Sequence, residues 1–198
     1  MGFNSYKISN NGYDKYVYDY LNKQEKLEKY ITEFNEPDLR ISDLHNLIEN
    51  NYQIEINGHN QTLKNALIKA DLVTLSIGND DFYQKLKLNY TTNELYDIVD
   101  NYVNDMEKLL LLIKKYCKED VVLLGYYDPV NSLTSEKVVT YMNKKMMDLT
   151  SENQIKYINL QTIINNNHLL NPNNNYISNT GYQKIGSEII KIIKKDIL

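Results

Sequence analysis

The sequence predicts a three-layer α/β/α sandwich built around a parallel sheet. Short apolar runs rich in β-branched and aromatic residues recur along the 198 residues, and they are nearly continuous rather than alternating. Such runs are typical of strands that are buried on both faces. Longer stretches with apolar residues at helical spacing lie between them. Strand–helix alternation of this kind places helices on both faces of a parallel sheet.

Four apolar runs are the predicted strands, and they cover residues 30–34, 72–77, 121–127 and 155–160. The residues 54–60 contain Asn57-Gly58, a tight-turn signal that predicts a small surface hairpin. In open parallel sheets, chemistry lies just beyond the carboxyl ends of the strands. The loops to examine for a site are therefore 76–81, 125–129 and 171–181.

The clearest predicted helix begins at Thr91 or Thr92 and ends near Lys118. Thr91 and Glu94 have the spacing of a capping box, and lysines near the end suit the negative pole of the helix dipole. Cys117 continues the apolar stripe of this helix and is predicted to be an unreactive core residue.

A second clear helix is predicted over residues 180–196, with Thr180 and Gln183 as its cap. Shorter amphipathic stretches predict helices at 13–23, 41–50, 62–70 and 135–149. No repeat and no Pro/Gly-rich linker divides the chain, so residues 1–198 are predicted to form a single domain.

Composition excludes several classes of protein. With 22 basic and 26 acidic residues the net charge is −4, so the chain has no basic surplus for nucleic acid or an anionic membrane. One cysteine allows neither an intrachain disulfide framework nor a Cys-rich zinc site. The sequence shows no signal-peptide core and no membrane-spanning run, so a cytoplasmic protein is expected for the chain as given, and its location stays open if the true start lies upstream. The 28 asparagines are interpreted as codon bias rather than a prion-like tract.

Several segments resemble the SGNH, or GDSL-type, hydrolases. ADLVTLSIGNDDFY at 70–83 resembles their third conserved block, an apolar strand followed by Gly-x-Asn-Asp. LLNPNNNYISNTGYQKIGSEII at 169–190 resembles their last block, and VVLLGYYDP at 121–129 resembles the strand and turn between them. Residues 11–21 and 39–44 are similar to the first helix and the second block. The resemblance implies a flavodoxin-like parallel sheet and an esterase or acyl hydrolase that needs no cofactor or metal.

The chemistry of that family needs a serine nucleophile after the first strand, a histidine base and an orienting aspartate. Its oxyanion is held by backbone N–H groups and by an asparagine side chain. The nucleophile block should be a strand ending in Gly-Asp-Ser, which this sequence does not show. Ser5 and Ser9 are poor candidates, because they would lie in the loop after the nucleophile. The resemblance therefore implies an N-terminally truncated member that lacks its first strand.

When the second and third blocks are aligned with the family pattern, acidic residues stand at positions where the family has a glycine and an asparagine. Asp38 stands where the second block has glycine, with Gly58 as a competing candidate in an ordinary turn context. Counting from Gly78, the oxyanion asparagine position holds Asp80, and Asn79 replaces it only if one residue has been deleted. An ionised aspartate would repel an oxyanion and has no proton to donate.

In the last block, the histidine position is Tyr176 and the orienting aspartate position is Asn173 or Asn174. Phenols ionise near pH 10 and make poor general bases at neutral pH. His168 lies upstream in a loop, where a solvated side chain is the simpler interpretation. His45 and His59 are likewise read as surface residues.

The resulting hypothesis is an SGNH-type ester hydrolase whose catalysis is impaired or lost. Gly78, Asp81 and Tyr127 are its predicted substrate-binding residues, and its partner would be a small ester or acylated molecule. One alternative is a binding module that keeps the cleft, with tyrosines as its stacking surface. Another is a Mg²⁺-binding flavodoxin-like domain that uses Asp80, Asp81 and Asp128. The sequence leaves the oligomeric state open.

Overall fold

A three-stranded parallel sheet forms the centre of the computed structural model, which describes residues 12–35, 38–56 and 58–196. Its strands are β3 (Leu72–Leu75), β4 (Asp120–Leu124) and β5 (Lys156–Ile158), in the order β3-β4-β5. The register pairs residues 72–75 with 120–123 and residues 122–124 with 156–158. The last four residues of β4 are at most 2% exposed. The predicted buried parallel sheet is therefore confirmed.

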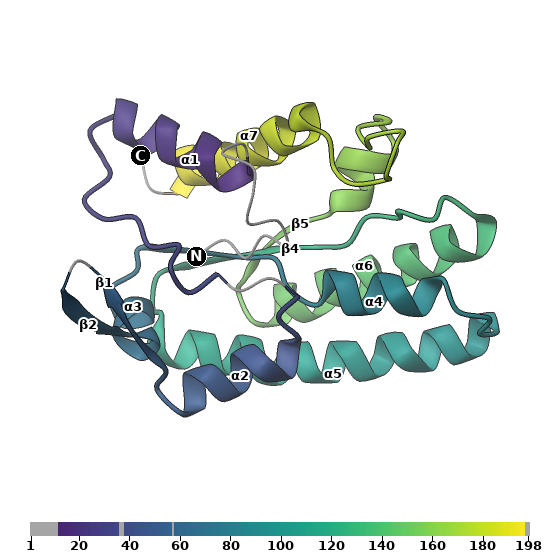
Figure 1. The fold of residues 1–198 in the computed structure, drawn as a ribbon, viewed down its shortest axis with the longest axis horizontal. Helices are drawn as coiled ribbons and strands as arrows, with labels where there is room; N and C mark the ends of the chain where they lie inside the picture. The colour runs from purple at the N-terminus through teal and green to yellow at the C-terminus, as the bar shows by residue number, and fades with distance from the viewer. Residues whose placement is uncertain (1–11, 36–37, 57, 197–198) are drawn as a thin grey trace.

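Helices cover both faces of this sheet (Figure 1). On one face α1 (Tyr13–Lys23) packs against α7 (Asn179–Asp196). On the other face α5 (Thr92–Tyr116) packs against α6 (Leu133–Glu152) and α2 (Ile41–Glu49). This arrangement confirms the three-layer α/β/α sandwich and five of the predicted helices.

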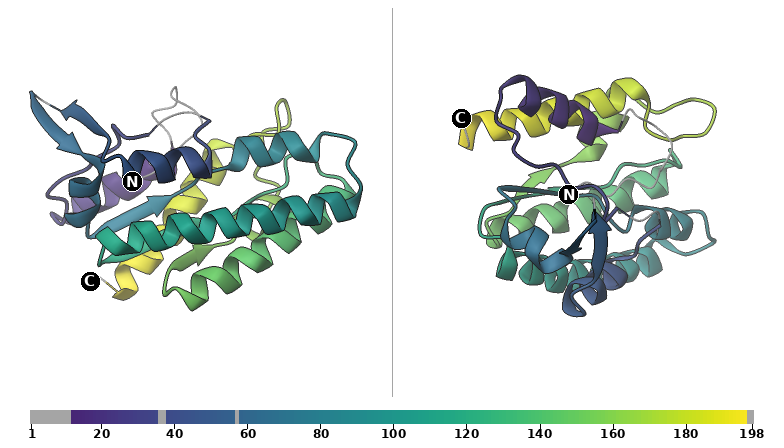
Figure 2. Two further views of the ribbon diagram at one scale, coloured as in Figure 1. Left: turned by 90° about the horizontal axis from the view of Figure 1, so that it is seen from below. Right: turned by 60° about the vertical axis from the view of Figure 1, so that its left-hand side comes forward.

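The predicted hairpin is present and stands out from the body of the molecule (Figure 2). It consists of β1 (Gln53–Ile56) paired antiparallel with β2 (His59–Thr62), and α3 (Leu63–Ile68) follows it directly. Gly58 in the turn has a φ of +77°, a left-handed conformation that glycine adopts without steric cost. Its neighbour Asn57 lies outside the described residues.

Helix caps agree with the sequence at α5 and differ at α7. Glu94 accepts a hydrogen bond from the Thr91 N–H at 2.7 Å, while the Thr91 hydroxyl accepts one from the Glu94 N–H at 3.3 Å. The predicted capping box is therefore confirmed. At α7 the cap is Ser178, whose hydroxyl accepts from the Gly181 N–H at 3.2 Å, so the prediction of Thr180 was wrong. The helix begins one residue earlier than its hydrophobic pattern indicated.

The strand predicted at residues 30–34 is wrong, because this stretch is an extended and turning connection between α1 and α2. A strand is stable when a neighbour pairs with its backbone groups, and no described strand pairs with this segment. Tyr30 is instead 38% exposed and donates its hydroxyl to Asp14 at 2.7 Å. The predicted lack of a first strand before α1 concerns residues 1–11, which lie outside the described residues, and Ser5 and Ser9 are among them.

The structure contains two elements that the sequence pattern did not predict. The helix α4 (Asn79–Leu86) begins inside the loop predicted after β3, and Gly78 caps it with a φ of +75°. A π-helical turn, η1 (Gln161–Asn165), follows β5. Both are shorter than the window of about 11 to 18 residues over which helical periodicity can be recognised in a sequence. No helix in the described part of the chain has the length and apolar character to cross a membrane.

Candidate functional site

A small cavity of about 50 Å³ lies at the carboxyl ends of the strands. All three loops predicted to carry chemistry contribute to it, through Ser76, Tyr127 and Tyr176 among others. Tyr13 of α1 and Tyr182 of α7 also line it. Seven of the nine predicted site residues are therefore in its lining, namely Asp38, Gly78, Asn79, Asp80, Asp81, Tyr127 and Tyr176.

The residues that follow β3 contribute polar side chains to the lining of this cavity. Gly78 turns the chain into α4 so that Asn79, Asp80 and Asp81 form the first helical turn. The left-handed φ of Gly78 favours glycine, and a Cβ atom there would also lie only 3.1 Å from a side-chain carbon of Ile41. Because the turn is tight, the residues that carry the Asn79 carboxamide and the Asp80 and Asp81 carboxylates all line the same cavity.

Only one of the two polar atoms of the Asn79 carboxamide forms a hydrogen bond. Its Nδ2 donates to the Ser76 hydroxyl at 3.0 Å, whereas its buried Oδ1 has no hydrogen-bond partner. Ser76 lines the same cavity and was not predicted as a site residue, although it opens the first loop proposed to carry chemistry. No described histidine lines the cavity beside this hydroxyl.

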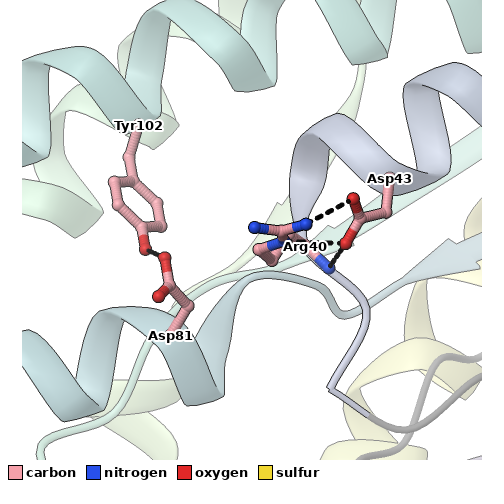
Figure 3. A network of polar contacts seen from close by, with 4 residues as sticks. All are labelled: Arg40, Asp43, Asp81 and Tyr102. Atoms are coloured by element: carbon pink, nitrogen blue, oxygen red, sulfur yellow. Dashed lines mark hydrogen bonds and ion pairs between the residues drawn. The ribbon is translucent and has the colours of Figure 1, made fainter.

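Asp81 of α4 contacts a tyrosine of α5 on one side and lies near Arg40 on the other (Figure 3). Its carboxylate accepts a hydrogen bond from the Tyr102 hydroxyl, and burial together with this acceptor raises the pKa of Tyr102. Arg40 makes two contacts with Asp43, at 2.9 and 3.0 Å, and the charge of Asp81 adds to the rise in the arginine's pKa. The Tyr102–Asp81 hydrogen bond therefore links α5 to α4, whereas the Arg40–Asp43 pair lies within the start of α2.

Asp38 stands at the exposed rim of the cavity with a φ of +55°. That left-handed conformation is the one that glycine adopts most easily, and the resemblance expects glycine at this position. Gly58, the competing candidate, lies in the hairpin turn with no atom within 4 Å of an added Cβ. It does not line the cavity.

Tyrosines form the wall on the β4 side. Tyr127 is 6% exposed, and its N–H donates to the hydroxyl oxygen of the buried Tyr83 at 3.1 Å. The two rings pack edge to face with centroids 4.9 Å apart. Burial is the main cause that raises the pKa of Tyr127, and the charge of Asp80 adds to it. The hydroxyl is therefore held in its neutral form.

The last loop brings Tyr176 to the cavity but leaves the two asparagines outside. Asn171 donates its N–H to the Tyr176 carbonyl at 2.7 Å, which closes the loop. Asn174 accepts from the Tyr176 N–H at 3.1 Å, and the Asn173 N–H donates to the Asn171 side chain at 3.0 Å. Both predicted aspartate positions are exposed turn residues and do not line the cavity.

The three histidines are all away from the cavity lining. His168 has a φ of +52° in the turn after η1, His45 faces Glu49 at 3.7 Å on α2, and His59 lies in β2. No cluster of three potential metal-ligating side chains occurs among the described residues. Asp128 in particular is 2% exposed and accepts from the Ser135 hydroxyl at 2.7 Å, away from Asp80 and Asp81 in the lining.

Comparison with known proteins identifies the fold. No family model matches the sequence, and no curated protein sequence matches it significantly. Among solved structures, the acetylxylan esterase Axe2 from Geobacillus stearothermophilus superimposes with a TM-score of 0.69 at 16% identity, covering 96% of this chain and 84% of that one. A member of the lipolytic protein G-D-S-L family from Veillonella parvula superimposes with a TM-score of 0.65 at 13% identity, covering 98% of this chain and 96% of that one.

A GDSL-like lipase from Parabacteroides merdae gives a TM-score of 0.67 at 14% identity, covering 93% of this chain and 87% of that one. These identities are too low to carry an activity across, but the coverage extends over nearly the whole chain. The superposed residues therefore include most of the parallel sheet and of the helices on both of its faces. The chain therefore has the SGNH/GDSL hydrolase-like fold.

Proposed function

We propose that the cavity binds a small ester or acylated molecule and that the chain hydrolyses it poorly or not at all. Support for the ligand class comes from the fold, which is shared with an acetylxylan esterase and GDSL-type lipases. The cavity lies where open parallel sheets bind their ligands. Its tyrosines offer the apolar and stacking surface that a small organic ligand needs.

One observation carries the loss of catalysis: no described histidine lines the cavity. A serine hydroxyl needs a base to take its proton, and the ionisable groups that the described residues bring to the lining are carboxylates and phenols. Carboxylates are weak bases at neutral pH, and phenols are protonated there. Asp80, in the first turn of α4, would also place a negative charge beside the developing oxyanion.

Binding is tested by titrating the chain with methyl acetate and following backbone amide resonances by NMR. We expect saturable shifts at Gly78 and Tyr176 that are weakened in Tyr176→Ala. Tyr90→Ala is the matched control, because Tyr90 is similarly exposed, at 38% against 42%, and does not line the cavity. Equal titration curves for the two variants would contradict the proposed site.

A further inference from the structure

The side chain of Tyr176 stands at the mouth of the cavity. Tyr176 is 42% exposed, whereas the other tyrosines of the lining are buried or half-buried, namely Tyr13, Tyr83, Tyr127 and Tyr182. Burial is the main cause that raises the pKa of Tyr127, and the phenols of Tyr182 and Tyr176 add to it. The Tyr176 phenol therefore reaches from the solvent side toward the buried wall of the cavity.

The loop holds the backbone of Tyr176 in place on both sides. Its N–H donates to the Asn174 side chain at 3.1 Å, and its carbonyl accepts from the Asn171 N–H at 2.7 Å. The next residue, Ile177, packs directly on the first turn of α7, because a Cβ atom added to Gly181 would lie 2.6 Å from Ile177 Cγ2. The fold itself therefore fixes where the Tyr176 ring lies.

The inner end of the cavity is closed by the core. Leu124, Leu160 and Ile185 line it and are each at most 2% exposed. Tyr83 and Tyr127 close the β4 side, with their rings packed edge to face. Close-packed interiors do not accept extra methylenes without strain. A longer ligand would therefore gain space most easily at the mouth, where Tyr176 lies.

The volume of about 50 Å³ sets the size of group that the cavity can hold. A bound water needs about 10–15 Å³ of volume measured in this way, so the cavity has room for about four non-hydrogen atoms. An acetyl group fits this space. A butanoyl group, which is two methylenes longer, exceeds it.

We propose that Tyr176 restricts the ligands of this cavity to acyl groups of about acetyl size. The inference rests on the proposed function and adds to it the residue that sets the length of the acyl chain. Replacing the phenol ring by a methyl group would open the mouth, and the freed space would take up further methylenes. Each methylene that is buried on binding raises the affinity about fourfold.

The probes are methyl acetate and methyl butanoate, titrated separately into the full chain and followed by NMR at the Gly78 amide. In the natural chain we expect methyl acetate to bind about tenfold more tightly than methyl butanoate. In Tyr176→Ala the preference should reverse, because methyl acetate loses its contact with the ring while methyl butanoate binds about tenfold more tightly than before. A methyl butanoate affinity that Tyr176→Ala leaves unchanged would overturn the proposal.

Two further variants separate the bulk of the ring from other effects. Tyr176→Phe keeps the ring without its hydroxyl and should keep the preference for methyl acetate. Tyr90→Ala removes a tyrosine of similar exposure that does not line the cavity, and it should keep the preference as well. A preference for methyl butanoate in either variant would show that the Tyr176 ring does not set the limit.

The same titrations separate this proposal from the proposed function. If the natural chain binds both esters equally well, the cavity is an ester site and only the size limit is wrong. If the natural chain binds neither ester but Tyr176→Ala binds methyl butanoate, Tyr176 restricts the cavity and ester binding by the natural chain is wrong. If neither ester binds the natural chain or Tyr176→Ala, both proposals fail together.

Discussion

The side-chain amide of Asn143 pairs with both backbone groups of Tyr126, accepting its N–H at 2.9 Å and donating to its carbonyl at 2.9 Å. Asn143 lies on α6 and is 2% exposed, whereas Tyr126 follows the end of β4. The contact continues the hydrogen bonding of the sheet after the strand ends. It fixes the direction in which the chain reaches Tyr127 and the cavity.

Asn143→Leu should destabilise the protein by about 3 kcal/mol, because it leaves both buried backbone groups of Tyr126 without partners. Urea unfolding followed by circular dichroism measures the change. Asn101→Ala, on the exposed side of α5, is the control and should change stability by less than about 0.5 kcal/mol. A loss below about 1 kcal/mol in Asn143→Leu would show that this pairing is not structurally important.

Gly78→Ala and Gly58→Ala separate backbone strain from packing. Both glycines have a φ near +76°, but only at Gly78 would the new Cβ press on Ile41, at 3.1 Å. We expect Gly58→Ala to cost about 1 kcal/mol and Gly78→Ala about 1 kcal/mol more. Thermal melting measures both, and equal losses would mean that Ile41 yields without cost.

The capping box of α5 should give a pH-dependent contribution to stability. Hydrogen bonds from the Thr91 N–H and hydroxyl lower the pKa of Glu94 below its ordinary value of 4.5. A carboxyl whose folded pKa is lowered stabilises the fold above its unfolded pKa, and the gain is lost as the pH falls through the folded value. The difference in unfolding free energy between the natural chain and Glu94→Gln should therefore shrink between pH 7 and pH 3. A difference that grows toward pH 3 would contradict this sign.

Cys117 should resist thiol reagents while the protein is folded. It is 0% exposed, its thiol points to the Ala70 carbonyl at 3.6 Å, and burial raises its pKa. Reaction with Ellman's reagent should be at least about a hundredfold faster in denaturing urea than in buffer, because only the exposed thiolate reacts. Comparable rates in the two solutions would place the thiol at the surface.

The elements that could be predicted from the sequence are those whose position depends on local residue patterns. Thr91 and Glu94 predicted the start of α5, and the apolar run through Leu123 predicted a central strand. The run at residues 30–34 has the same apolar, β-rich character but has no described strand beside it. A sequence pattern of one segment cannot show whether a second strand is available to pair with it. Short elements such as α4 are set by Gly78 and by packing against Ile41, which is tertiary information.

The candidate site was predictable where topology brings residues together. The carboxyl-end rule and the family register placed Asp80, Asp38 and Tyr176 in one region, and the structure brings them to one cavity. Counting alone could not show that Asn173 and Asn174 turn outward to build the loop. Tyr13 was missed because its place in the lining depends on how α1 lies over the sheet.

We propose that this hydrolase-like fold keeps a ligand cavity without the groups for efficient ester hydrolysis. The initial rate of p-nitrophenyl acetate hydrolysis, measured against substrate concentration at neutral pH, tests it most directly. We expect a rate that rises linearly with no saturation and that Ser76→Ala leaves unchanged. A fast, saturable rate that Ser76→Ala or Asp80→Asn abolishes would contradict it.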